Sequence, residues 1–123
     1  MKILVFENEI PKVKDAFSDV NELDFNKELK IKYVDKSQNF GDYKDSLNYD
    51  LIFVDIDLSP TSEKDGYGVI EEIKKFGNNN IVVLTGNMVE EELKKRGLSD
   101  IKILSKPIFL DELKNIIESF RNN

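Results

Sequence analysis

The stretch LIFVDIDLSPT, residues 51–61, decides the fold. Its first four residues are apolar and rich in β-branched and aromatic side chains, which is typical of a strand buried on both faces. Asp55 ends this run, and a second acid, Asp57, follows two positions later. A carboxylate is costly to bury unless it is paired or binds a metal. Asp55 is therefore either a simple strand end or part of a working site at the carboxyl end of a strand.

Four more segments are predicted to be strands. Residues 3–6 (ILVF) and 81–84 (IVVL) resemble the run before Asp55 and predict buried parallel strands. Residues 31–34 (IKYV) and 101–104 (IKIL) predict weaker strands nearer the edges of the sheet. Apolar residues at helical spacing, or favourable charge pairs four residues apart, predict helices between the strands. These helical segments are 10–20, 69–76, 88–96 and 110–120, and we also expect residues 40–48 to form a short helix.

Strand and helix thus alternate five times, which implies a parallel sheet covered by helices on both faces. In such a sheet the ligand crevice lies outside the carboxyl ends of the strands. Ionisable or polar side chains follow four of the predicted strands at this edge. They are Glu7 and Asn8, Asp55 and Asp57, Thr85, and Lys106.

The composition excludes several classes of function. The 123 residues suit one domain, and their 40% hydrophobic content exceeds the range of disordered chains. A net charge of −6 argues against a nucleic-acid surface and an anionic membrane surface. The chain has neither Cys nor His, which excludes disulfides, thiolate or imidazole metal sites and His-based triads. The N-terminal MKILVFENE is neither a signal peptide nor a membrane span, so we expect a cytoplasmic protein.

The polar residues at the strand ends resemble those of the receiver domain of two-component response regulators. The resemblance covers the whole chain and includes DGYGVIEEIK, residues 65–74, which looks like the family's Asp-Gly start of the third helix. It implies an α/β, flavodoxin-like (βα)5 three-layer sandwich, with a five-stranded parallel sheet in the order 2-1-3-4-5 and helices on both faces. We expect residues 1–123 to form a single receiver domain without an output domain. The signal would then pass through a partner, a homodimer or another part of a longer parent protein.

The same resemblance implies the roles of the site residues. Asp55 would be the nucleophile that accepts a phosphoryl group from a phosphohistidine on a sensor histidine kinase or phosphotransfer protein. Thr85 and Lys106 would bind phosphoryl oxygens. Mg²⁺ would be held by Asn8, Asp55 and the backbone carbonyl of Asp57, with Glu7 acting through water. The sequence does not identify the downstream target.

Three features depart from the pattern of the family. Asn8 replaces the acid that normally touches the metal, so we expect weak Mg²⁺ binding and slower phosphorylation. Ile103 stands where the family usually has an aromatic switch residue, so an aromatic rotation cannot follow the movement of Thr85. The loop SPTSEKDG, residues 59–66, makes the connection after Asp57 about three residues longer than expected of the family.

Each of these residues also has a simpler interpretation. Asp55 could only end a strand, Lys106 could be a solvated surface lysine, and Thr85 could satisfy a turn or cap a helix. The departures at Asn8 and Ile103 favour a receiver-like interaction module that no longer uses phosphate. DIDLSPT also resembles the nucleophile motif of haloacid-dehalogenase-type phosphatases, but that motif normally ends a first strand rather than a third. At most, therefore, we expect self-phosphorylation and self-dephosphorylation rather than a turnover enzyme.

Overall fold

A computed structural model describes residues 1–121. Its strands and helices follow one another in the predicted alternation. In chain order they are β1 (Lys2–Phe6), α1 (Ile10–Asp24), β2 (Lys30–Val34), the 3₁₀ helices η1 (Ser37–Asn39) and η2 (Tyr43–Asn48), β3 (Leu51–Asp55), α2 (Gly66–Lys75), β4 (Ile81–Thr85), α3 (Glu90–Lys95), β5 (Lys102–Ser105) and α4 (Leu110–Arg121).

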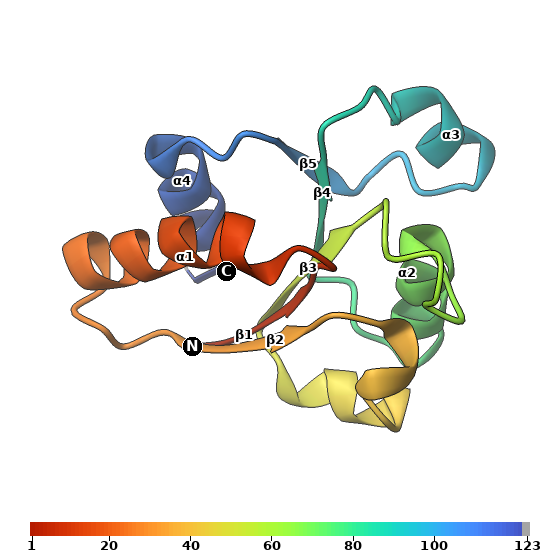
Figure 1. The fold of residues 1–123 in the computed structure, drawn as a ribbon, viewed down its shortest axis with the longest axis horizontal. Coiled ribbons are helices and arrows are strands. Elements are labelled where there is room, and N and C mark those ends of the chain that lie inside the picture. Colours follow the sequence, from red (N-terminus) through yellow and green to blue (C-terminus); the bar gives the residue numbers. More distant parts are fainter. Residues whose placement is uncertain (122–123) are drawn as a thin grey trace.

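The five strands form one parallel sheet in the order β2-β1-β3-β4-β5, which confirms the predicted topology (Figure 1). The two weaker strands, β2 and β5, lie at the edges. The ends of neighbouring strands lie in register: Phe6 pairs with Val54, Asp55 with Leu84, and Thr85 with Ser105. All the strands run in the same direction, so their carboxyl ends meet along one edge of the sheet.

Alternating side chains of the strands supply two cores, one on each face of the sheet. On one face, α1 and α4 cover Val5 and Phe53, and Phe17 of α1 packs edge-on against Phe53. On the other face, Leu4 and Phe6 belong to a core to which η2, α2 and α3 also contribute buried side chains. Figure 1 shows α1 and α4 on one side of the sheet and α2 on the other. Each fully buried phenylalanine contributes roughly 1.5–3 kcal/mol, so the two cores hold the strand ends at fixed positions.

The segment predicted as a short second helix forms 3₁₀ rather than α-helical turns. Residues 40–48 contribute only the 3₁₀ helix η2, and a shorter 3₁₀ helix, η1, precedes it. This segment lacks an apolar stripe long enough to stabilise several α-helical turns, since only Tyr43 and Ser46 of η2 are buried. In the 88–96 segment, where charge pairs four residues apart predict a helix, Glu92 and Arg96 form such an ion pair at 2.9 Å. Gly97 then adopts a φ of 73°, a left-handed conformation that commonly ends a helix.

No helix within residues 1–121 is long and apolar enough to cross a bilayer.

Candidate functional site

The elements bring an acid, a second acid and an amine together at the carboxyl edge of the sheet. Glu7 follows β1, Asp55 ends β3 and Lys106 follows β5. The Lys106 ammonium donates a hydrogen bond to Asp55 Oδ2 at 3.0 Å and also pairs closely with Glu7 Oε1. Glu7 and Asp55 are almost completely buried, with exposed fractions of 0% and 3%. The structure thus unites residues that lie 99 positions apart in the chain.

The remaining carboxylate oxygens accept hydrogen bonds from the backbone. Asp55 Oδ1 accepts from the N–H of Asp57 at 2.9 Å, and Glu7 Oε2 accepts from the N–H of Glu9 at 3.4 Å. A buried carboxylate needs such partners because desolvation penalises its charge. These bonds also fix the rotamers of both acids, so the oxygens have defined positions at the edge of the sheet.

The charges of this cluster do not balance, because one ammonium faces two carboxylates. Burial, together with the neighbouring Glu7, raises the pKa of Asp55 to about 7 against the opposing effect of Lys106. Burial lowers the pKa of Lys106, but the hydrogen bonds to Glu7 and Asp55 outweigh that effect and the pKa is raised. Lys106 therefore stays charged at neutral pH, whereas Asp55 is poised between its neutral and ionised forms.

Thr85 lies at the end of β4 and is buried, but its hydroxyl is engaged in a local turn. Thr85 Oγ1 accepts a hydrogen bond from the N–H of Asn87 at 3.0 Å and donates one to the Asn87 carbonyl at 3.3 Å. The simpler interpretation of Thr85 as a turn residue therefore describes this arrangement. A ligand on Asp55 would have to draw the hydroxyl proton away from a long, weak bond.

Asn87 is a residue that the sequence interpretation missed. Its side-chain amide donates to Asp57 Oδ2 at 3.0 Å and so links the loop after β3 to the loop after β4. Asp57 is exposed, as expected of a residue whose backbone matters more than its side chain. A polar residue two positions after Thr85 was the available signal, but such residues are common in loops.

The oxygen donors at this edge fit a hard divalent cation in their chemistry. Glu7 and Asp55 offer carboxylates, Asn8 offers an amide oxygen, and Asp57 offers a backbone carbonyl, all of which are ligand types that Mg²⁺ accepts. The excess negative charge of the buried pair is what such a cation would neutralise. Within residues 1–121 no three acidic side chains converge to form a metal site by themselves. A cation here would therefore depend on the amide, the carbonyl and water for its other ligands.

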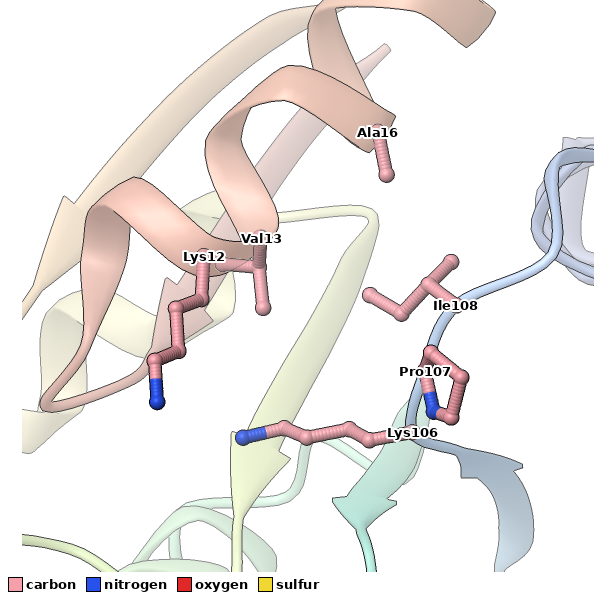
Figure 2. A pocket seen from close by; sticks show the side chains of 6 residues that line it. All are labelled: Lys12, Val13, Ala16, Lys106, Pro107 and Ile108. Carbon is pink, nitrogen blue, oxygen red and sulfur yellow. The ribbon is translucent and has the colours of Figure 1, made fainter.

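A groove runs beside the buried cluster, between α1 and the segment after β5. Figure 2 shows Val13 and Ala16 of α1 facing Pro107 and Ile108 across it, while the amine of Lys106 reaches toward the end of β3. The Lys106–Pro107 peptide bond is cis. The groove therefore places an apolar surface directly next to the Lys106–Asp55 pair.

The chain matches no protein-family model and no curated protein. Solved structures do match it over nearly its full length. A two-component response regulator from Clostridium difficile is 22% identical with a TM-score of 0.71, and the match covers 100% of this chain and 97% of that one. The receiver domain of NtrX from Brucella abortus is 21% identical with a TM-score of 0.74, covering 98% of both chains.

A third similar structure is the receiver domain of a sensor histidine kinase from Pseudomonas aeruginosa, described with a magnesium ion coordinated in its active site cleft. It is 21% identical to this chain with a TM-score of 0.70, and the match covers 99% of this chain and 98% of that one. At these levels of identity the likeness concerns the fold. The chain therefore has the fold of the response regulator receiver domains.

Proposed function

We propose that this chain is a receiver that accepts a phosphoryl group on Asp55 from a phosphohistidine of a sensor histidine kinase or phosphotransfer protein. The observation that carries the proposal is the contact between Lys106 Nζ and Asp55 Oδ2 at 3.0 Å, at the carboxyl edge of a receiver-like sheet. A residue that only ends a strand needs neither a buried carboxylate, nor an amine paired with it, nor a second acid in the same cluster. A strand-end acid would be solvated, whereas Asp55 is 3% exposed.

In the proposed reaction Asp55 acts as the nucleophile. A carboxylate oxygen of Asp55 forms a bond to phosphorus while the bond from phosphorus to the imidazole nitrogen of the donor breaks. The imidazole leaves with the electron pair of that bond, so no base is needed on this chain, which fits its lack of His. The ionised form of Asp55 is the reactive one, and without metal its fraction rises as the pH passes the raised pKa of about 7.

Lys106 and Thr85 would bind the transferred group. The charged amine of Lys106 lies within hydrogen-bond distance of Asp55, so it is positioned to pair with an oxygen of a phosphoryl group carried there. The Thr85 hydroxyl could donate to another oxygen after it leaves the Asn87 carbonyl. The hydroxyl would exchange its 3.3 Å hydrogen bond to the Asn87 carbonyl for a charge-assisted hydrogen bond to a phosphoryl oxygen, which favours this movement.

Asn8, Asp55 and the carbonyl of Asp57 would hold Mg²⁺, with Glu7 acting through water. When bound, the cation supplies positive charge that neutralises the phosphoryl oxygens as they approach the acid. Glu7 has a further role that does not depend on the metal, because it holds the Lys106 amine at the acceptor. Asn8 contributes a neutral oxygen, so we expect the cation to bind weakly.

The phosphorylated form would then change its binding to a partner protein. The groove beside Lys106 supports contact with a donor protein at this edge, because its apolar surface adjoins the acceptor. Ile103 is partly buried against the core that includes α2 and α3. Because this residue is not aromatic, the rotation of an aromatic side chain cannot transmit the signal at this position. We therefore expect the response to travel through the loop that carries Thr85 and Asn87.

Intact-mass spectrometry tests the proposal. With Mg²⁺ and an excess of a small phosphodonor such as acetyl phosphate, the protein is expected to gain the mass of one phosphoryl group, and Asp55→Asn is expected to gain none. Lys106→Ala keeps the acceptor and serves as a second variant, in which we expect labelling to slow by about 10²-fold or more. An unchanged mass of the wild type under saturating donor would rule the proposal out.

A second candidate function is an interaction module that no longer uses phosphate, and Asn8 and Ile103 favour it. In that case a partner would bind the wild type and Asp55→Asn with the same affinity, in the presence or absence of phosphodonor. The receiver proposal instead requires that the donor changes the affinity of the wild type alone. A binding titration with both proteins separates the two functions.

A further inference from the structure

The loop between β3 and α2 is anchored at its tip, although the sequence suggests only a long connection. Residues 61–64 of this loop lie against η1, which follows the edge strand β2. Four hydrogen bonds join the two segments, and all of them involve Ser37 or Gln38 of η1. We call this set of contacts, between Ser37–Gln38 and residues 61–64, the loop clamp.

Ser37 forms the buried half of the loop clamp, since only 2% of it is exposed. Its backbone N–H donates to Ser62 Oγ at 2.9 Å, and its own Oγ accepts from the N–H of Lys64 at 2.8 Å. A buried hydroxyl and a buried amide are thus both satisfied by the loop. Removing either partner would leave a polar group without a hydrogen bond, which makes the contact specific.

Gln38 forms the exposed half. Its side-chain Nε2 donates to the Thr61 carbonyl at 2.9 Å, while its Oε1 accepts from the N–H of Glu63 at 2.9 Å. One side-chain amide therefore forms hydrogen bonds with the loop backbone on both sides of Ser62. Because these contacts are made to backbone groups, they constrain the course of the loop.

Both ends of this loop adjoin the candidate acceptor. At the first end, the N–H of Asp57 donates to Asp55 Oδ1 at 2.9 Å. At the other end, Gly66 lies so close to the backbone of Asp55 that an added Cβ would overlap it, and its N–H donates to the Ile56 carbonyl at 3.2 Å. A loop held at both ends and at its tip has few alternative conformations, which restricts the backbone around Asp57.

We propose that Ser37 and Gln38 are positioning residues of the acceptor site, which act through the loop clamp to pre-organise the Asp57 carbonyl for Mg²⁺. The inference rests on the proposed function for the identity of the ligand. It gives the longer loop a purpose, since the loop is held by η1, the short 3₁₀ helix that follows β2. Pre-organisation lowers the entropy lost on binding and so partly offsets the charge that Asn8 lacks.

Hydrogen exchange and Mg²⁺ titration test the inference in Gln38→Ala, an exposed substitution that removes no core contact. Without metal, we expect faster exchange of the Glu63 and Lys64 amides, which donate into the loop clamp. With Mg²⁺ alone as the probe, we expect an affinity about fivefold lower than that of the wild type. Gln38→Glu keeps the acceptor for Glu63 and loses the donor to Thr61, so its affinity should be intermediate.

Asn39→Ala is the matched control. Asn39 is the adjacent residue and its amide also makes a hydrogen bond, at 2.8 Å, but to Asp35 of its own segment rather than to the loop. We expect this variant to exchange and to bind Mg²⁺ like the wild type.

Unchanged protection of Glu63 and Lys64 in Gln38→Ala would overturn the inference. Loss of protection with unchanged Mg²⁺ affinity would also overturn it, because the loop clamp would then have a structural role only. A wild type that binds no Mg²⁺ would overturn it as well. A wild type that binds Mg²⁺ more tightly than Gln38→Ala, yet takes no phosphoryl group, would refute the proposed function and leave the clamp standing.

Discussion

At the scale of single residues, Asp55 combines deep burial with an incomplete balance of charge. It shares one ammonium with Glu7, and burial together with Glu7 raises its pKa to about 7 from an ordinary 3.8. Such a group costs stability when it is ionised, and perturbed acids of this kind cluster at functional sites. This cost is what the proposed acceptor role would explain.

The pH dependence of stability follows from this shift. The folded protein binds more protons than the unfolded chain between about pH 4 and pH 7, so the free energy of unfolding should increase as the pH falls from 8 to 5. The expected gain is roughly 2–4 kcal/mol. The chain has no His, so few other side chains titrate in this window. Urea unfolding at several pH values without metal measures the effect.

Asp55→Asn should remove most of the pH dependence of the free energy of unfolding. It should also stabilise the protein at pH 8 by roughly 1–3 kcal/mol, because the amide carries no charge to desolvate. Its Oδ1 can still accept from the N–H of Asp57. A variant that is less stable than the wild type at pH 8 would show that the buried carboxylate is not the source of the penalty.

Asn8 is the residue whose replacement should improve the site. Asn8→Asp adds a full negative charge next to Glu7 and should raise the affinity for Mg²⁺ about tenfold, since hard cations prefer carboxylates to amides. Calorimetric titration measures this change. Asn115→Asp adds the same charge on the exposed face of α4 and should leave the affinity unchanged. Equal affinities in all three proteins would remove Asn8 from the ligand set.

At the scale of elements, the site depends on how closely α2 approaches β3. The first residue of α2, Gly66, lies directly on the backbone of Asp55, where a side chain does not fit. Asp65 caps this helix by accepting a hydrogen bond from the N–H of Gly68 at 2.8 Å. The Asp-Gly pair thus begins the helix and brings it against the strand that carries Asp55.

Gly66→Ala should therefore destabilise the protein by about 2–4 kcal/mol, because the added methyl group overlaps the Asp55 carbonyl and neither backbone can yield cheaply. Gly86→Ala is the matched control, since nothing lies within 4 Å of its added Cβ. Thermal unfolding compares the two variants. Equal midpoints would mean that α2 can shift away from β3 without cost.

The strands and the principal helices were predictable because each carries its own periodic pattern. Short apolar runs indicated β1, β3 and β4, and the Leu113–Ile117 stripe indicated α4. The segment at 40–48 is predicted to be a short helix of unstated type; in the structure it forms 3₁₀ turns, and Phe40 and Tyr43 pack against Phe6. The type of helix depends on tertiary packing, which the local sequence pattern does not show.

At the scale of the whole molecule, the topology explains why the site could be anticipated. A parallel sheet brings every strand end to one edge, so polar residues after β1, β3, β4 and β5 had to lie near one another. The Glu7–Lys106 and Asp55–Lys106 contacts follow from that rule. The Asn87–Asp57 bridge and the loop clamp do not, because they join irregular segments whose approach depends on loop conformation.

The central claim is that Asp55 and Lys106 form one phosphoryl-binding site, and a crystal structure with Mg²⁺ and beryllofluoride tests it most directly. We predict beryllium bonded to an Asp55 oxygen, the Lys106 amine and the Thr85 hydroxyl on its fluorides, and the metal on Asn8 and the Asp57 carbonyl. A structure at saturating beryllofluoride in which Asp55 stays unmodified and paired with Lys106 would contradict the account.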